Sequence, residues 1–226
     1  SFAFFIILFV MHINNINLPK KVLSWYDNNK RTLPWRVGKN SKNKQYYRIL
    51  SEYMLQQTQV KTVIPYFKNF VKEIPNLKVL STSGEKQVLK LWEGLGYYRR
   101  AKNLWKTSKI LVKEYRSKIP DNFVDLKKMP GIGDYTANVL LALIYNQPRI
   151  GLDGNVKRIL FRLFNLNVFD SVNLFKTKRN ADLAEALMEF GALICKPKEP
   201  KCNVCKFKKI CYYYNLESKV KLSKKI

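Results

Sequence analysis

Four cysteines lie within 17 residues near the end of the chain, and the sequence contains no other cysteine. Their spacing is C-x6-C-x2-C-x5-C, and four thiolates in one loop could hold a tetrahedral zinc ion or a [4Fe–4S] cluster. Zinc modules usually carry two C-x2-C pairs, so the single pair here favours the cluster over zinc or free thiols. Six lysines and one acid between the cysteines suit phosphate contact better than docking of a redox partner. The predicted ligands are Cys195, Cys202, Cys205 and Cys211.

Two carboxylates, Glu52 and Asp153, stand out in a chain with only 16 acidic residues against 42 basic ones. Such a pair could supply a general acid and an electrostatic partner for an oxocarbenium-like cation, as in the cleavage of glycosidic bonds. The alternatives are structural. Asp153 could cap the helix that follows it, and Glu52 could complement the helix dipole in a first turn.

Residues 126–137, LKKMPGIGDYTA, predict a tight turn between two helical stretches. Glycines in such a turn permit positive φ angles, and the N–H groups that open the second helix could bind a phosphate oxygen. The pattern is typical of the helix-hairpin-helix, a sequence-independent grip on the DNA backbone. The alternative is a turn whose glycines serve packing alone. The residues predicted to contact the backbone are Lys127, Lys128, Gly131, Ile132 and Gly133.

The elements that must position these groups are helices, because apolar residues recur with the helical period in eight stretches. No stretch shows sustained alternation with hairpin turn signals, so a sheet is not expected. We therefore predict an all-α protein. The expected helices cover residues 20–29, 46–57, 60–73, 84–94, 99–115, 135–145, 155–163 and 181–195.

The 226 residues are 46% hydrophobic, which is typical of a globular chain with one large domain or two small ones. The net charge of +26 implies a polyanionic partner, first nucleic acid and second an anionic membrane surface. The basic residues are 32 Lys and 10 Arg, a bias that an AT-rich genome would also produce.

The two ends of the chain carry no predicted site. Residues 1–10 are apolar but reach only about half of the roughly 20 residues of a membrane span, and they lack signal-peptide flanks. We expect translation to begin at Met11 and no membrane partner. Residues 217–226 form a basic tail that we expect to fray.

The order of hairpin, acid pair and cysteine loop resembles the helix-hairpin-helix DNA glycosylase superfamily, and within it the iron–sulfur adenine DNA glycosylases of the MutY type. The resemblance covers about residues 25–211 and is carried by the cysteine loop and five further stretches. These are WYDNNKRTLPWR (25–36), SEYMLQQTQVKTVIPYF (51–67), LWEGLGYYRRAKNL (91–104), MPGIGDYTANVL (129–140) and GLDGNVKRIL (151–160).

The resemblance implies two helical domains with the active-site cleft between them. A six-helix domain would cover 40–147, with the hairpin at about 125–145. A cluster domain would combine 12–39 with 148–215, leaving tails at 1–11 and 216–226. It also implies a [4Fe–4S] cofactor, double-stranded DNA as partner, a monomer, and an intracellular location in the cytoplasm or nucleoid.

The resemblance assigns roles to the matching positions. Glu52 would protonate adenine N7 and Asp153 would stabilise the sugar cation, with support from Tyr135 and Asn155. Because adenine is a poor leaving group as an anion, protonation at N7 would let it leave as a neutral base. The pocket for the extruded adenine would be lined by Arg31, Trp35, Arg36 and Glu185. The wedge that enters the base stack would consist of Gln57, Thr58, Leu95 and Tyr97.

The implied function is base excision repair, in which adenine opposite 8-oxoguanine or guanine is hydrolysed from a flipped-out nucleotide. Endonuclease III-type relatives carry a lysine nucleophile where this chain has Tyr135, and tyrosine cannot form an imine, so we expect a monofunctional glycosylase with little lyase activity. The chain ends 15 residues after Cys211. The second domain that reads 8-oxoguanine in the family is therefore not matched, and the preference for 8-oxoguanine over guanine stays open. Residues 165–182 are expected to contain a trimmed helix.

Three other functions compete with this interpretation. The first is a glycosylase for T or U opposite G, or one of the endonuclease III type. The second is a non-catalytic DNA-binding remnant, against which the intact acid pair argues. The third is a ferredoxin-like carrier, which the long unrelated helical part of the chain disfavours.

Overall fold

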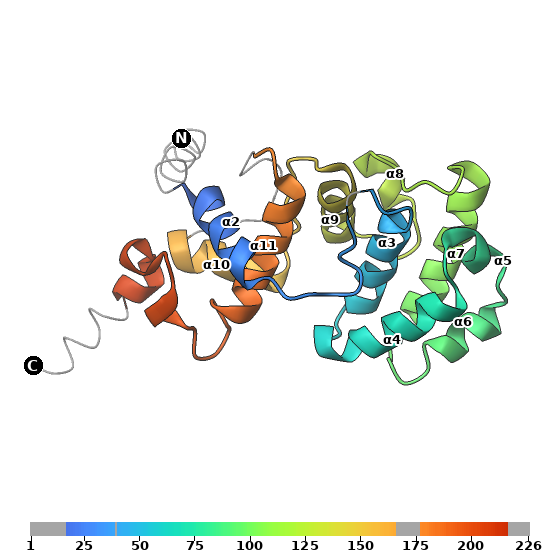
Figure 1. Ribbon diagram of the computed structural model, residues 1–226, viewed down its shortest axis with the longest axis horizontal. Coiled ribbons are helices and arrows are strands. Elements are labelled where there is room, and N and C mark those ends of the chain that lie inside the picture. The colour runs from blue at the N-terminus through green and yellow to red at the C-terminus, as the bar shows by residue number, and fades with distance from the viewer. Residues whose placement is uncertain (1–16, 39, 166–176, 217–226) are drawn as a thin grey trace, which may run out of the picture. The chain divides into compact units, whose positions relative to one another are not determined.

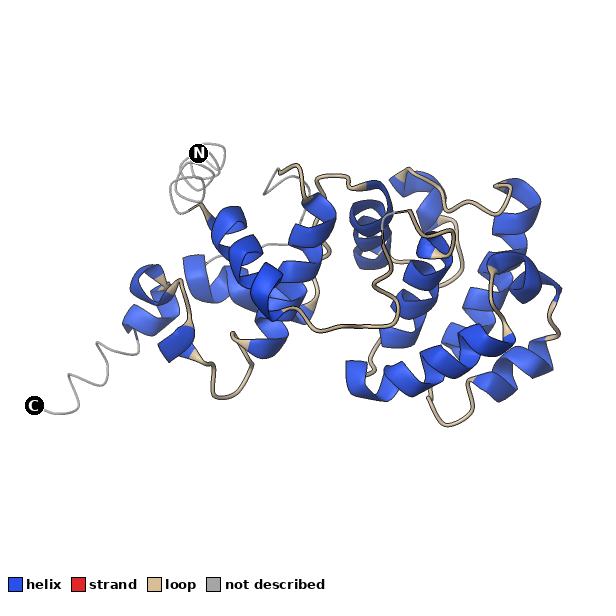
Figure 2. Ribbon diagram, viewed as in Figure 1, coloured by secondary structure: helices blue, strands red, loops and turns tan. Residues whose placement is uncertain are grey.

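The computed structural model describes residues 17–38, 40–165 and 177–216. The apolar run 1–10 with Met11, the tail 217–226 and residues 166–176 of the expected trimmed helix lie outside the described residues. Every regular element in the described part is a helix, as Figure 2 shows, and the prediction of an all-α protein is confirmed.

The chain divides into two compact units (Figure 1). The larger unit is continuous and covers residues 31–145. The smaller unit combines the N-terminal segment up to residue 30 with the chain from residue 146 onward. The predicted domain limits were 40–147 for one domain and 12–39 with 148–215 for the other. This division does not test them, and they stay predictions.

In the larger unit, every residue of helix α9 (Asp134–Tyr145) from Thr136 to Ile144 is buried. Helix α3 packs against α4, α7 and α9, while α5 and α6 pack against α7 (Figure 1). Aromatic side chains fill the core, with the rings of Phe70 and Trp92 edge to face at 6.1 Å. The other helices of this unit are α3 (Lys44–Leu55), α4 (Val60–Glu73), α5 (Leu77–Thr82), α6 (Glu85–Leu91), α7 (Arg99–Glu114) and α8 (Phe123–Lys127).

The smaller unit packs α2 (Leu18–Asn29) and α10 (Gly154–Phe164) against α11 (Asn180–Leu193). Two short 3-10 turns, Cys202–Val204 and Lys208–Ile210, follow in the cysteine loop. The loop is anchored by Phe207, whose buried ring meets Phe190 edge to face at 5.6 Å; Phe190 in turn meets Trp25 at 5.0 Å.

All eight predicted helical stretches contain a helix. The short helices α5 and α8 were not among these stretches, although the predicted hairpin required a helix where α8 lies. They have six and five residues, too few for an apolar period to show. Each begins at an asparagine whose side chain caps it. Asn76 accepts from the Val79 N–H at 3.0 Å, and Asn122 accepts from the Asp125 N–H at 2.9 Å.

Helices α10 and α11 approach each other closely at Gly191, where an added Cβ would lie 2.6 Å from the Cβ of Asn155. Alanine normally stabilises a helix by about 1 kcal/mol relative to glycine. We expect Gly191→Ala to do the opposite and to lower the free energy of unfolding by about 1–3 kcal/mol through overpacking.

Urea denaturation measures this change, and Gly154→Ala is the matched control because an added Cβ there has no atom within 4 Å. We expect the control to leave stability unchanged or slightly raised. A stabilising Gly191→Ala would show that the two helices do not meet this closely.

Candidate functional site

Glu52 lies in the third turn of α3 with only 7% of its surface exposed. The first turn of α3 contains no acid, so Glu52 does not complement the positive end of the helix dipole. The position therefore argues against the dipole alternative, and the chemical role of Glu52 stays a prediction.

The next residue of α3, Tyr53, fastens the hairpin to the same helix. Its buried hydroxyl donates to the carbonyl of Pro130 and lies 2.9 Å from the hydroxyl of Thr107. One turn further, the Gln56 side chain donates to the carbonyl of Gly131 at 3.3 Å. Glu52 and the hairpin turn thus share one rigid frame.

The hairpin itself joins α8 to α9 through a turn with an apolar underside and an exposed backbone. Met129 and Ile132 are buried in the core at 2% and 5% exposure, whereas Gly131 and Gly133 are exposed. Gly131 has φ 80°, and a Cβ there would lie 2.6 Å from Nδ2 of Asn103. Within the described residues, the N–H groups of both glycines donate to no backbone carbonyl. They are available to a phosphate oxygen.

Both lysines at the hairpin are paired with nearby acids. Lys127 Nζ lies 2.5 Å from Asp134 Oδ1, and Lys128 Nζ lies 2.6 Å from Asp125 Oδ1. The hydrogen bond raises the pKa of Lys128 and lowers that of Asp125. Exposed pairs of this kind contribute little stability, so a phosphate can compete for the lysines. Tyr135 lies half-buried in the first turn of α9.

The predicted wedge residues belong to two loops of the larger unit. The loop after α3 exposes Gln57 and places Thr58 so that its N–H donates to Leu55 at 3.2 Å. The loop before α7 exposes 62% of Tyr97, whereas Leu95 is 6% exposed and packs into the core. That the four residues act as a wedge stays a prediction.

The residues predicted to line an adenine pocket are divided between the units. In the larger unit, Trp35 is 3% exposed and packs edge to face on Phe67, and Arg36 donates to the carbonyl of Arg31 at 2.9 Å. In the smaller unit, buried Glu185 accepts from the Tyr26 hydroxyl at 2.6 Å. The pocket stays a prediction, as does the cleft between Glu52 and Asp153.

Asp153 caps α10 and is oriented by its neighbour. One carboxylate oxygen accepts from the Val156 N–H at 2.7 Å, and the other accepts from the side-chain amide of Asn155 at 2.8 Å. Asp153 therefore does cap the helix, and it also accepts a hydrogen bond from Asn155, the residue predicted to support it. Because Asp153 is only partly buried, its carboxylate can serve both purposes.

Arg158 continues this chain of contacts and was not among the predicted site residues. Its guanidinium donates to Asn155 Oδ1 at 2.7 Å, to the Cys195 carbonyl at 2.7 Å and to the Gly191 carbonyl at 2.8 Å. It thereby connects the support of Asp153 to the first residue of the cysteine loop. The only signal in the sequence was an arginine three positions after Asn155.

None of the four cysteines forms a disulfide in the structure, and Cys211 is buried. Burial, with added repulsion from the other three thiols, raises the pKa of Cys205 to about 11. Backbone N–H groups of Phe207 and Tyr214 donate to the sulfurs of Cys205 and Cys211. Over the part of the chain that is described, no group of three or more His, Cys, Asp or Glu residues is arranged to hold a metal ion. By number and donor type, four sulfurs with N–H donors around them fit an iron–sulfur cluster.

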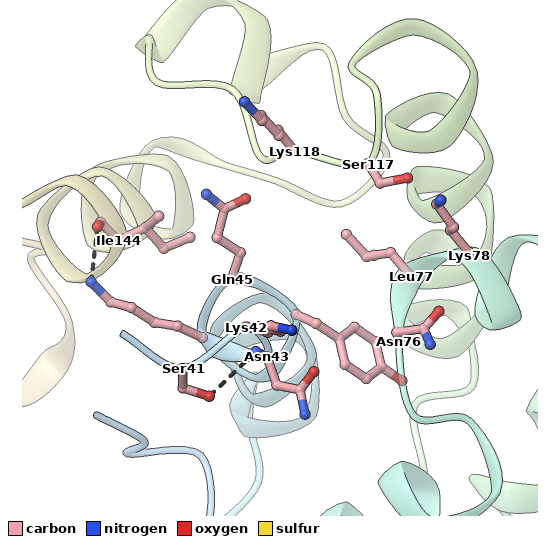
Figure 3. Close-up of a pocket in the computed structure, with 12 residues that line it drawn as sticks. Ser41, Lys42, Asn43, Gln45, Asn76, Leu77, Lys78, Ser117, Lys118 and Ile144 are labelled. Atoms are coloured by element: carbon pink, nitrogen blue, oxygen red, sulfur yellow. Dashed lines mark hydrogen bonds between the residues drawn. The ribbon is translucent and has the colours of Figure 1, made fainter. Parts of the chain in front are cut away.

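A pocket of about 730 Å³ lies elsewhere in the larger unit (Figure 3). Lys44 is one of the residues that line it, and its ammonium donates to the carbonyl of Ile144, at the end of α9 remote from the hairpin. Lys42, Lys78 and Lys118 also line it, but none of the predicted site residues does. The pocket is therefore separate from the candidate site.

None of the helices in residues 17–38, 40–165 and 177–216 is long and apolar enough to cross a membrane.

Residues 50–183 match the HhH-GPD superfamily, whose members are described as base excision DNA repair proteins. The match covers more than half of the chain and contains Glu52, the hairpin and Asp153. The chain belongs to this superfamily.

Within it, the chain is similar to adenine DNA glycosylases, which confirms the resemblance noted in the sequence. It is 42% identical over 204 residues to the adenine DNA glycosylase of Buchnera aphidicola subsp. Baizongia pistaciae, covering 85% of this chain and 57% of the relative. It is 34% identical over 207 residues to that of Homo sapiens, covering 84% of this chain and 38% of the relative. The chain thus spans less than two thirds of the length of these relatives.

Solved structures share the fold. A thermostable thymine-DNA glycosylase matches with a TM-score of 0.81 at 23% identity, covering 91% of this chain and 99% of that one. Endonuclease III in a non-covalent DNA complex matches with a TM-score of 0.74 at 19% identity, covering 91% and 97%.

Two substitutions test the capping role of Asp153. Asp153→Ala removes the cap and should lower the free energy of unfolding by about 1 kcal/mol. Asp153→Ser keeps an oxygen for the Val156 N–H and should stay within about 0.5 kcal/mol of the wild type. Chemical denaturation measures both, and equal losses for the two variants would refute the capping role.

Proposed function

We propose that the chain is an adenine DNA glycosylase, which hydrolyses the N-glycosidic bond of adenine opposite 8-oxoguanine or guanine in duplex DNA. The observation that carries the proposal is the buried Glu52, held by α3 in the same frame as a hairpin with free backbone N–H groups. The similarity to adenine DNA glycosylases supports the choice of base. The charge of +26 supports duplex DNA as the partner.

In the proposed reaction the adenine is first turned out of the duplex, because its reacting atoms are inaccessible within the stack. Glu52 then gives its proton to N7, and the electron pair of the C1′–N9 bond leaves with the base. Water supplies a hydroxyl to C1′ and returns a proton to Glu52. The products are neutral adenine and an abasic site.

Asp153 faces the positive charge that develops on the sugar as the bond breaks. The side-chain amide of Asn155 fixes the direction of this carboxylate at 2.8 Å, and Arg158 fixes Asn155. The two oxygens of Asp153 are thereby held without rearrangement during the reaction. Preorganised charges of this kind commonly supply a large share of the catalytic effect.

We further propose that the four cysteines hold a [4Fe–4S] cluster. When bound, the cluster crosslinks residues 195–211 and stiffens a lysine-rich loop that can meet phosphates. Arg162 already orders the beginning of this loop by donating to the carbonyls of Lys196 at 2.6 Å and Pro197 at 2.9 Å. We expect a monomer acting on genomic DNA.

The substrate is tested with duplexes that contain A·8-oxoG, A·G, T·G or thymine glycol, each analysed before and after alkali. We expect base release only from the two adenine-containing mispairs, with strand breaks that appear only after alkali because Tyr135 cannot form an imine. Release from T·G alone would assign the chain to mismatched thymine instead. No release from any duplex would leave only a DNA-binding role.

Glu52→Gln keeps the size of the side chain but removes the acid proton. We expect single-turnover adenine release to fall at least about a thousandfold, with duplex affinity within about twofold. Glu73→Gln, an exposed acid at the end of α4, is the charge-matched control and should behave as the wild type. If affinity collapses together with the rate, Glu52 is structural.

The hairpin lysines should report their phosphate contacts in the salt dependence of binding. Replacing Lys127 and Lys128 together by Gln should reduce the slope of log K against log[salt] by about 0.9 per lost contact, or about 1.8. The same double change at Lys42 and Lys78, which line the remote pocket, is the control. Equal slopes for the two double variants would remove the hairpin lysines from the interface.

A further inference from the structure

Arg100 in α7 is a buried arginine that the proposed chemistry does not use. It is 6% exposed, and burial lowers the pKa of its guanidinium, which stays charged at neutral pH. All the acceptors of its side chain are backbone carbonyls. They belong to Tyr53 (3.3 Å), Met54 (2.6 Å), Gln56, Leu95 (3.4 Å) and Gly96 (3.1 Å).

These acceptors come from two separate segments. Nη1 donates to the three carbonyls at the end of α3. The last carbonyl groups of a helix have no hydrogen-bond partners within that helix. Nη2 serves the two carbonyls in the loop before α7. One planar group therefore fixes the spacing between the two loops that carry the predicted wedge.

The contacts fall beside two residues whose backbone is in the left-handed region. Gln57 has φ 58° and Tyr97 has φ 49°, left-handed conformations that cost energy in any residue except glycine. The peptide carbonyl immediately before each of them, Gln56 and Gly96, accepts from Arg100. These hydrogen bonds hold the peptide planes from which both exposed side chains project.

The surroundings of the guanidinium require its flat shape. Its central carbon lies 5.6 Å from the centroid of the Trp92 ring and 5.3 Å from that of Tyr97. Trp92 also donates its indole N–H to the carbonyl of Gly96 at 3.2 Å. A lysine could keep the charge but could not reach both segments from one point.

We propose that Arg100 is a positioning residue for base extrusion, holding residues 56–58 and 95–97 so that Gln57 and Tyr97 can fill the gap left by the flipped nucleotide. The proposal rests on the function proposed above. Arg100 itself, being buried, acts through the two loops rather than by touching the DNA.

The test uses the full chain and a duplex with 2-aminopurine in place of the target adenine, whose fluorescence rises when the base leaves the stack. Arg100→Met keeps much of the length but removes all donors. We expect it to reduce the fluorescence rise about fivefold, and to slow single-turnover adenine release about tenfold to a hundredfold. Affinity for an unmodified duplex should stay within about twofold, since the hairpin is untouched. Arg100→Lys should be intermediate.

Leu111→Ala, at another buried position of α7, controls for lost stability. Compared at a temperature where every variant is folded, it should keep the wild-type fluorescence rise. The proposal is overturned if Arg100→Met keeps that rise, or loses it only in step with Leu111→Ala.

The outcome also separates this proposal from the proposed function. A wild-type chain that extrudes 2-aminopurine but releases no adenine would refute the glycosylase function and leave the positioning role standing. A wild-type chain that gives no fluorescence rise would refute the positioning role.

Discussion

The terminal carbonyl groups of α3 have no partners within the helix. The groups that donate to them fix the position of several other segments of the larger unit. The Arg100 guanidinium donates hydrogen bonds to the carbonyls of Tyr53 and Met54, and the Thr58 N–H donates one to the carbonyl of Leu55. In the same turn, the Tyr53 hydroxyl donates a hydrogen bond to the carbonyl of Pro130 in the hairpin. The buried acid, the hairpin and the loop after α3 are consequently fixed to one helix end.

In the smaller unit, a series of contacts orients the partly exposed carboxylate of Asp153. Gly191 allows α10 and α11 to meet at Asn155, and Asn155 then holds Asp153 while Arg158 holds Asn155. Because Arg158 also bonds the carbonyl of Cys195, the order of the cysteine loop and the order of the acid are connected. A cluster in that loop would therefore support the geometry of the carboxylate without taking part in the reaction.

Much of this arrangement can be predicted from the sequence, because amphipathic helices, glycine turns and cysteine loops can be recognised from residue types and their spacing. The helical fold and the hairpin were predicted in this way, and the superfamily was predicted from a resemblance carried by the order of the motifs. Arg100 and Arg158 could not be, since their acceptors are mostly backbone carbonyls, which every residue carries. Leu95 illustrates the same limit, because Gly94 before it is exposed and Gly96 after it is partly exposed, while its own side chain packs in the core.

The most direct test of the proposed role of Glu52 is a crystal structure of the Glu52→Gln variant bound to a duplex with adenine opposite 8-oxoguanine. We expect an adenine outside the stack, with its N7 within hydrogen-bond distance of residue 52 and Asp153 on the side of the sugar C1′. An adenine that remains stacked, or an extruded adenine with N7 remote from residue 52, would contradict it.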